Sequence, residues 1–275
     1  MLDPRELAET RDTALAIARE AGALLLSGWR KSLRVSKKGA IDLVTDFDLR
    51  CEALLRERLA RAFPAHTVVA EEGAARDHVD ARPVWYVDPI DGTKDFIRGS
   101  DGFAVMIGLC LAARPVIGVV FQPTSARLFA ASPARGAWME LPDGAVHPLA
   151  VSTIAEVSAI RLVASKSHRS EVIDEVKSAL GIADELNIGS VGLKLALIAL
   201  GERDLYVNPF PKCKAWDTCA PEAILVAAGG MLTDTAGDPV RYDQLDLSRP
   251  RGLVASNGHV HAASLARLAR LFPKK

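Results

Sequence analysis

The sequence predicts a mixed α/β fold, in which a β-rich part precedes a part with alternating strands and helices. From Phe103 to about Leu141, short β-rich segments are separated by Gly, Pro and Ser, which indicates an antiparallel meander. After residue 152, strand-like and helix-like segments alternate, as they do in α/β proteins. The 275 residues, 49% of them hydrophobic, provide a sizeable core for one large domain or two smaller ones.

Two helices are expected before the meander. Asp3 and Glu6 flank a first-turn proline in helix-start order, and apolar residues then recur at helical spacing until about Trp29. A second helix is expected over residues 46–63, and a polar loop that contains residues 37–39 should connect the two. Four leucines of the second helix should point inward: Leu49, Leu54, Leu55 and Leu59.

The remaining elements suggest two subdomains. Short buried strands are expected over 66–72 and 84–88, and the polar stretch 141–152 is the best candidate for a boundary. We therefore divide the chain into an N-terminal α+β subdomain, residues 1–145, and a C-terminal α/β subdomain, residues 146–275. The alternating segments of the second subdomain follow in chain order: 160–165, 171–180, 192–200, 204–208, 220–230, 252–256 and 260–271.

Charge and composition exclude several classes of partner. The charges of the 34 basic and 34 acidic residues cancel, so the chain lacks the excess of positive charge that favours binding to a nucleic-acid polymer or an anionic membrane. No apolar run approaches the length of a membrane span, and the first residues lack the order of a signal peptide. The four scattered cysteines are typical of reduced thiols: Cys51, Cys110, Cys213 and Cys219. We expect a cytoplasmic protein.

The stretch "DPIDGT" places two aspartates, Asp88 and Asp91, on either side of a proline. Asp-Pro and Asp-Gly are ordinary turn dipeptides, so a surface turn is one interpretation. Other acids share the same placement, because Glu71 ends a strand and Asp217 opens a helix, while Asp48 lies in a first helical turn. Ligands collect where strands end and helices begin, so these acids are candidates for one site.

Clustered oxygen donors without a His or Cys set indicate a hard cation, and Mg²⁺ typically takes a few carboxylates together with phosphate and water. The Ile90 carbonyl lies between the two aspartates of "DPIDGT" and is a further donor. Gly92 allows the backbone to approach a phosphate, and the Gly92 and Thr93 N–H groups can face an anion at a helix start. Thr93 Oγ1 can accept a proton from water if Asp48 orients it.

Four blocks of the chain resemble the signature blocks of the inositol monophosphatase superfamily, in the family's order: "DLVTDFD" (42–48), "VVAEEG" (68–73), "DPIDGTKDF" (88–96) and "WDTCAPEAILVAAGG" (216–230). The resemblance implies a layered αβαβα sandwich. It also implies Mg²⁺-dependent, lithium-sensitive hydrolysis of a small phosphomonoester, with two or three Mg²⁺ per site. Dimers occur widely in that superfamily, so a homodimer is compatible with the resemblance.

The resemblance also implies roles for individual residues. The metal-ligand positions match Glu71, Asp88, Ile90 (through its carbonyl), Asp91 and Asp217. Asp48 and Thr93 match the pair that activates the nucleophilic water, and Gly92 and Thr93 match the backbone phosphate cradle. The N-terminal subdomain would then carry most metal ligands, and the C-terminal one would carry Asp217 and the substrate-selecting residues.

Three further segments bear on the choice of substrate. Lys94 in "DGTKDF", the segment "SKSHRS" (165–170) and Lys194 in "GSVGLK" are similar to the 3′(2′),5′-bisphosphate nucleotidase branch, although the last spacing is one residue longer. His168, Arg169 and Lys194 could pair with a second phosphate, and Lys94 and Ser167 are further candidates for binding the phosphate or the substrate. A polar turn for "SKSHR" and a solvated helix position for Lys194 are the alternative interpretations.

We therefore expect a phosphatase that acts on a small phosphorylated metabolite, with 3′-phosphoadenosine 5′-phosphate favoured over inositol 1-phosphate. A broad sugar phosphatase that includes fructose 1,6-bisphosphate is a third substrate class. A metal-dependent sensor that binds phosphometabolites without turnover is the alternative from another class, although a sensor could lose Asp48 or Thr93 without losing affinity.

Overall fold

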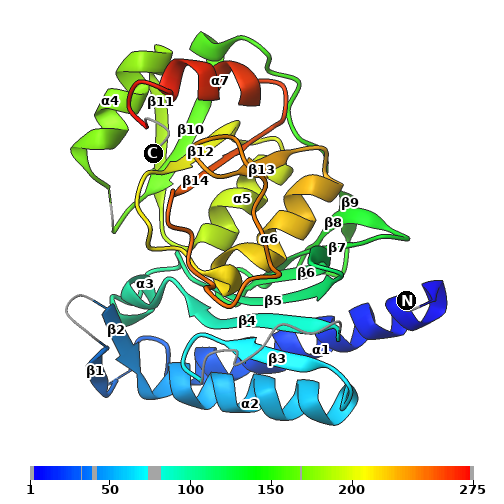
Figure 1. Cartoon of the computed structure of the whole chain (residues 1–275). Helices are drawn as coiled ribbons and strands as arrows, with labels where there is room; N and C mark the ends of the chain where they lie inside the picture. Colours follow the sequence, from blue (N-terminus) through cyan, green and yellow to red (C-terminus); the bar gives the residue numbers. More distant parts are fainter. Residues whose placement is uncertain (1–2, 32, 39–41, 74–81, 168, 273–275) are drawn as a thin grey trace.

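The computed structural model describes residues 3–31, 33–38, 42–73, 82–167 and 169–272, and all counts of elements refer to these residues. The elements stack in five layers: helices, a sheet, helices, a second sheet and helices (Figure 1). The predicted mixed α/β class and the αβαβα sandwich are confirmed. Among the described residues, no helix combines the length and apolar character needed to cross a membrane.

The first layer consists of α1 (Pro4–Gly28) and α2 (Asp46–Ala62), and both begin where the sequence predicts. The Asp3 carboxylate accepts hydrogen bonds from the N–H groups of Arg5 and Glu6, which satisfies donors that the helix itself leaves unpaired. Thr45 caps α2 in the same way, with Asp48 as the third residue of a capping box.

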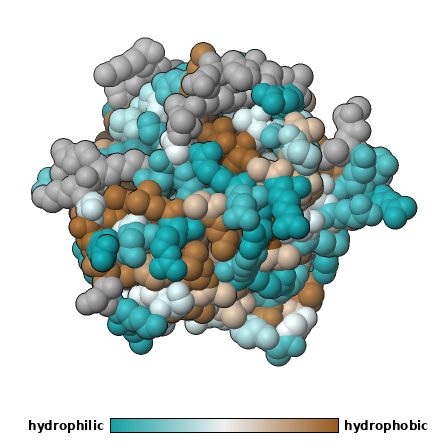
Figure 2. Space-filling model, turned by 90° about the horizontal axis from the view of Figure 1, so that it is seen from below, coloured by the Kyte–Doolittle hydropathy of each residue, from teal (hydrophilic) through white to brown (hydrophobic). Residues whose placement is uncertain are grey.

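The outer face of this layer carries interspersed apolar and polar side chains (Figure 2). Leu49 was expected to point inward, but it is 55% exposed, so that prediction is wrong. Leu49 lies outside the helical stripe of buried residues on α2 that contains Asp48, Cys51, Glu52, Leu55 and Leu59. Leu54 is half-buried, and Leu55 and Leu59 are buried as expected.

The first sheet has seven strands in the order β3-β4-β5-β6-β7-β8-β9. Only β3 and β4 run parallel, and the pairs from β4 to β9 are antiparallel, which confirms the predicted meander. The strands are β3 (Thr67–Ala70), β4 (Val84–Asp91), β5 (Ala104–Leu111), β6 (Arg114–Gln122), β7 (Arg127–Ser132), β8 (Gly136–Glu140) and β9 (Val146–Pro148).

The region before α2 differs from the predicted polar loop. Residues 35–38 and 42–45 form an antiparallel pair, β1 (Val35–Lys38) and β2 (Asp42–Thr45), beside the short helix α3 (Thr93–Ile97). The lysines made this segment look like a solvated loop, although β1 and β2 are close in sequence and pair from Lys38 opposite Asp42 to Val35 opposite Thr45. Gly39 lies outside the described residues.

The second sheet has the order β11-β10-β12-β14-β13 and mixes parallel and antiparallel pairs. Its strands are β10 (Arg161–Ser165), β11 (Asp184–Ile188), β12 (Leu205–Asn208), β13 (Met231–Thr233) and β14 (Leu253–Ser256). The helices α4 (Glu171–Leu180) and α7 (His261–Leu268) form the outer layer, and a 3₁₀ turn, η1 (Val157–Ala159), precedes β10 (Figure 1). The sequence patterns did not indicate β11 and β13, which are short and partly polar.

The middle layer contains two helices whose N-termini lie at the candidate site, α5 (Val191–Ala199) and α6 (Ala215–Ala227). Both are apolar on most of their surface, because sheets cover them on two sides. Two glycines of the first sheet allow α6 to approach closely. A Cβ at Gly108 would lie 2.6 Å from the Ala220 nitrogen, and one at Gly118 would lie 2.1 Å from the Ala220 oxygen. The sheet thereby fixes the position of the α6 N-terminus.

His261, at the start of α7, is buried and contacts Thr233 through Nε2 and Ser256 through Nδ1, each at 2.9 Å. Burial lowers the pKa of His261 from 6.5 to about 4, because the charged imidazolium loses its hydration. Below pH 6.5 the unfolded chain therefore binds a proton that the folded chain excludes. The folded state loses stability as the pH falls from 6.5 to about 4.

We predict that His261→Gln reduces this loss. Between pH 7 and pH 4 the free energy of unfolding of the wild type should fall by about 3 kcal/mol more than that of the variant. Urea unfolding at several pH values measures the free energy of unfolding of each protein. The pH dependence of the variant is subtracted from that of the wild type, because carboxylates titrate in both proteins. Parallel pH profiles for the two proteins would contradict a buried neutral His261.

Candidate active site

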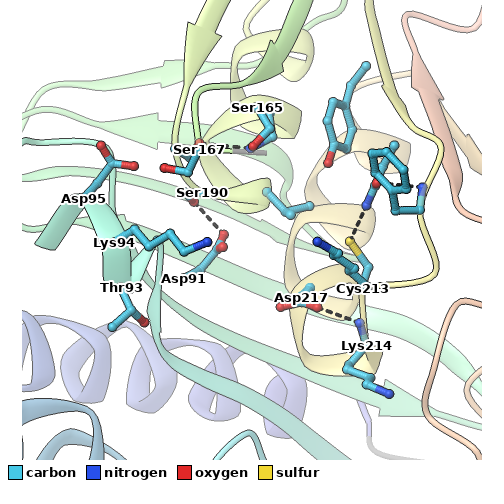
Figure 3. A pocket seen from close by; sticks show the side chains of 18 of the residues that line it. Asp91, Thr93, Lys94, Asp95, Ser165, Ser167, Ser190, Cys213, Lys214 and Asp217 are labelled. Carbon is cyan, nitrogen blue, oxygen red and sulfur yellow. Dashed lines mark hydrogen bonds between the residues drawn. The ribbon is translucent and has the colours of Figure 1, made fainter. Parts of the chain in front are cut away.

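A pocket of about 590 Å³ collects the N-termini of α3, α5 and α6 and the ends of β10 and β12 (Figure 3). Glu71, which directly follows β3, also lines it. The polar lining residues labelled in Figure 3 include Asp91, Thr93 and Asp217, which approach from two different helices and the end of β4. The pocket therefore joins parts of the chain that the sequence analysis assigned to different subdomains.

Three carboxylates meet at this pocket. Oxygen atoms of Asp88, Asp91 and Asp217 lie within 4.8 Å of one another. Asp88 and Asp91 are buried at the end of β4, and Asp217 is half-buried in the first turn of α6. The sequence prediction that acids at these element ends come together is supported by this geometry.

Hydrogen-bond donors hold each carboxylate in place. The Ile90 N–H donates to Asp88 Oδ1 at 2.9 Å, and the Lys214 N–H donates to Asp217 Oδ2 at 2.5 Å. Asp91 Oδ2 accepts from the Ser190 hydroxyl at 2.6 Å and from the Gly192 N–H at 2.8 Å. These donors orient the acids without cancelling their charge.

The clustering makes the ionised acids unfavourable in the absence of a cation. Burial raises the pKa of Asp88 well above its ordinary value, and the neighbouring carboxyl groups, led by Glu71, raise it further. Burial also raises the pKa of Asp217 to about 7, with a further contribution from the charge of Asp91. Buried like charges favour either a shared proton or a bound cation.

A further carboxylate, that of Asp48, lies beside this cluster and is linked through Thr93 to the Ile90 carbonyl. Asp48 Oδ2 accepts hydrogen bonds from the Thr45 N–H at 2.7 Å and the Thr45 hydroxyl at 2.6 Å, which fixes the carboxylate. Its other oxygen, Oδ1, lies 3.0 Å from Thr93 Oγ1, and the Ile90 carbonyl oxygen lies 3.0 Å from the same hydroxyl. Burial raises the pKa of Asp48, and the bonds from Thr45 and Thr93 oppose that rise.

The turn between β4 and α3 requires glycine. Gly92 has φ = 104°, a left-handed conformation that favours glycine, and a Cβ there would lie 2.5 Å from the Gly102 carbonyl oxygen. Gly92 and Thr93, the residues predicted to form a phosphate cradle, line the pocket together with Lys94. The capping box of Asp48 and the glycine turn are thus local features that also bring Thr93 to the acids.

The residues expected to select the substrate fall into two groups. Ser167 and Lys194 line the pocket. Lys194 is 2% exposed, so its alternative interpretation as a solvated helix position is wrong. Its ammonium donates to the Gly189 carbonyl at 3.1 Å and lies 5.3 Å from the centre of the Tyr206 ring. Burial lowers the pKa of Lys194, while Asp91 opposes that shift.

Arg169 belongs to the second group, because it is absent from the pocket lining. Its guanidinium is paired with Asp174 at 2.5 Å and with Glu185 at 2.6 Å, so its fork is already bound by two carboxylates. These partners hold its pKa above the ordinary value. His168 lies outside the described residues.

Sequence reasoning missed the residues that support the acids. Ser190 is the main example, since its partner Asp91 lies 99 residues away and no local pattern links them. Ser190 has φ = 48°, which is unusual for a residue other than glycine and allows the hydroxyl to bond both Asp91 and the Leu193 N–H. The sequence analysis also gave no role to Asp95, whose buried carboxylate accepts from the Ser100 hydroxyl at 2.6 Å and lines the pocket.

Comparisons with known proteins agree with this geometry. The model of the "Inositol monophosphatase family" matches residues 6–273. The chain belongs to the inositol monophosphatase family. It is 33% identical over 264 residues to "Inositol monophosphatase 2" of Solanum lycopersicum, covering 92% of this chain and 95% of the relative. It is 30% identical to "3'(2'),5'-bisphosphate nucleotidase 1" of Rattus norvegicus, covering 76% and 77%.

The fold agrees as well. An inositol monophosphatase structure from Anabaena is 27% identical and superimposes with a TM-score of 0.77 over 96% of both chains. The chain is therefore a phosphatase of the inositol monophosphatase family, and the family acts on small phosphorylated substrates. The identities to a monophosphatase and a nucleotidase are close to each other, so the choice of substrate depends on the pocket itself.

We predict that the Ser190 hydroxyl aligns Asp91. Ser190→Ala removes a hydrogen bond to a buried carboxylate, which should raise the concentration of divalent cation needed for half-maximal activity by roughly tenfold. Ser190→Gly is the matched control for backbone strain, because it removes the same hydroxyl while relieving the positive φ. The two variants should show the same dependence on the cation. A wild-type dependence in Ser190→Gly would show that only the backbone conformation matters.

Proposed function

We propose that this chain is a Mg²⁺-dependent, Li⁺-inhibited phosphomonoesterase that hydrolyses 3′-phosphoadenosine 5′-phosphate to AMP and phosphate. The observation that carries the phosphatase assignment is the cluster of Asp88, Asp91 and Asp217 beside the Asp48–Thr93 pair. The observation that favours a substrate with two phosphates is a lysine buried in the same pocket, Lys194.

The donor set fits a hard cation. Carboxylate oxygens are the ligands that Mg²⁺ prefers, and no histidine or cysteine belongs to the cluster that the described residues form. Asp88, Asp91 and Asp217 would hold the ions, with Glu71 and the Ile90 carbonyl completing the set. Bound Mg²⁺ would supply a water of lowered pKa and stabilise the negative charge that develops on the phosphoryl and leaving oxygens.

The protein groups would handle the proton of the attacking water. When the Thr93 hydroxyl donates to Asp48 Oδ1, its oxygen presents a lone pair that can accept the water proton. Asp48 then receives the threonine proton, and its raised pKa favours this role near neutral pH. Thr45 keeps Asp48 oriented throughout, because both of its bonds go to the other carboxylate oxygen.

The phosphate would bind against the backbone at Gly92 and Thr93, with Lys94 at the same end of the pocket. The Lys194 ammonium would face a second phosphate. A buried ammonium is costly unless an anion compensates it, and its bond to the neutral Gly189 carbonyl leaves further donor capacity. Ser167 provides a hydroxyl in the same lining.

Inositol 1-phosphate is the second candidate substrate. The 33% identity to a plant protein named inositol monophosphatase favours it, and the cluster of acids would serve either ester. The two substrates differ in the groups that the pocket must bind, since only the nucleotide has a second phosphate. The test of Lys194 below separates the two.

We predict phosphate release with Mg²⁺ that EDTA abolishes and added Mg²⁺ restores. Asp91→Asn should lower kcat by roughly a hundredfold or more, since it removes a charge from the cluster. Glu175→Gln is the matched control, because it neutralises an exposed acid on α4. Phosphate-binding without turnover in the wild type would identify a sensor instead. Near-normal turnover in Asp91→Asn would remove Asp91 from the site.

We predict that the wild type prefers 3′-phosphoadenosine 5′-phosphate over inositol 1-phosphate by about a hundredfold in kcat/KM, roughly 2.7 kcal/mol of transition-state binding. Lys194→Met should remove most of this preference and change turnover of inositol 1-phosphate little. Arg169→Met should leave the preference unchanged, because carboxylates outside the pocket already hold this guanidinium. A wild type that prefers inositol 1-phosphate would make the chain an inositol monophosphatase.

A further inference from the structure

A second hollow, of about 770 Å³, lies between the β5–β6 turn and the segment that connects β13 to β14. Residues 112–114 form one wall, and residues 234–253 provide the rest of the lining. Ala112 and Ala113 both have positive φ, so the turn has a defined conformation that presents Arg114 at the rim. None of the residues proposed above for catalysis lines this hollow.

Charged side chains dominate the lining. Four arginines and three aspartates contribute to it: Arg114, Arg241, Arg249, Arg251, Asp234, Asp238 and Asp243. Two of the arginines neutralise the aspartates. Arg241 pairs with Asp243 at 2.6 Å, and Arg251 pairs with Asp238 at 2.7 Å and with Asp234 at 3.3 Å. Arg114 and Arg249 form no ion pair with any other described residue.

Arg249 is the unusual member of this set, because it is only 6% exposed. Its Nη1 lies 3.3 Å from the Ser248 carbonyl oxygen and its Nη2 lies 3.4 Å from Thr218 Oγ1, which are long contacts to neutral oxygens. Its Nε is buried without a hydrogen-bond partner among the described residues. A buried guanidinium with so little compensation costs stability unless an anion binds it.

The nearby interior does not provide that anion directly. The acid of the interior that belongs to this network is Glu222, and the Tyr242 hydroxyl donates to its Oε2 at 2.6 Å. The Arg249 guanidinium makes no hydrogen bond to Glu222 and lies 4.9 Å from the centre of the Tyr242 ring. Burial raises the pKa of Glu222 to about 7, although the hydrogen bond from Tyr242 and the charges of Arg249 and Arg114 oppose the rise, so this carboxyl is only a partial counter-charge for the two arginines. The backbone N–H of Arg249 donates to the Cys213 carbonyl at 2.9 Å, which fixes the arginine beside the N-terminus of α6.

We propose that this hollow is a second anion site, in which Arg249 at the floor and Arg114 at the rim bind a phosphate or carboxylate group. Guanidinium forks match both groups with two parallel hydrogen bonds, and they bind tightly when one fork is desolvated. An anion there would supply the partner that Arg249 lacks. The floor of this site is continuous with α6, because Arg249 contacts Thr218, the residue after Asp217.

The experiment measures the binding of inorganic phosphate and, separately, succinate, by calorimetry and thermal unfolding. Metal ions are first removed on a chelating resin and the buffer contains no chelator, so that metal-dependent binding of phosphate in the active-site pocket does not contribute and no other polycarboxylate competes with the probe. The wild type should bind a probe and gain stability with its concentration. Arg249→Met should abolish both effects, and Arg114→Gln should weaken binding about tenfold. Tighter binding of phosphate or of succinate identifies which oxyanion the site takes.

Lys194→Met is the matched control, since it removes a buried cation from the other pocket and should leave this binding unchanged. Without any anion, Arg249→Met should be at least as stable as the wild type, because an uncompensated charge has been removed. Arg114 is exposed, so its variant folds even if Arg249→Met does not. The proposal is overturned if neither probe binds, if Arg114→Gln binds like the wild type, or if Lys194→Met alone loses binding.

Discussion

The mutual repulsion of Asp88, Asp91 and Asp217, held within 4.8 Å of one another, is the constraint on which the rest of the site depends. Carboxylates so close would separate or take up protons if nothing held them. Each is restrained by backbone N–H or hydroxyl donors, and these come from elements that the core already positions. The fold therefore holds a cluster of negatively charged side chains at which a cation can bind.

The two central helices, α5 and α6, connect the cluster of acids to the packed core. α6 carries Asp217, and its close contact with the first sheet depends on the absence of side chains at Gly108 and Gly118. Ser190 is the N-cap of α5 and its hydroxyl holds Asp91, and the helix carries Lys194 one turn later. Asp217, the hydroxyl that holds Asp91 and the buried lysine are thus set by these two helices, while Asp88 and Asp91 belong to β4, so the spacing within the pocket is a property of core packing.

The sequence by itself determined the elements whose causes are local. The caps at Asp3 and Thr45 depend on residues two or three positions away, and the structure confirms both. The meander, the family and the acids at element ends were also predictable, because turn residues and short motifs specify them within a few positions. Gly92 belongs here too, since a left-handed turn between a strand and a helix selects glycine.

Only the tertiary structure decided the features that depend on distant partners. Ser190 reaches Asp91 across 99 residues. Arg114 and Arg249 line the same hollow, although one begins β6 of the first sheet and the other lies between β13 and β14 of the second sheet. Arg169 looked available for a substrate until Asp174 and Glu185 were placed around it. A single sequence reports residue type and local spacing, whereas burial and pairing arise when segments pack, and these decide which charges remain for a ligand.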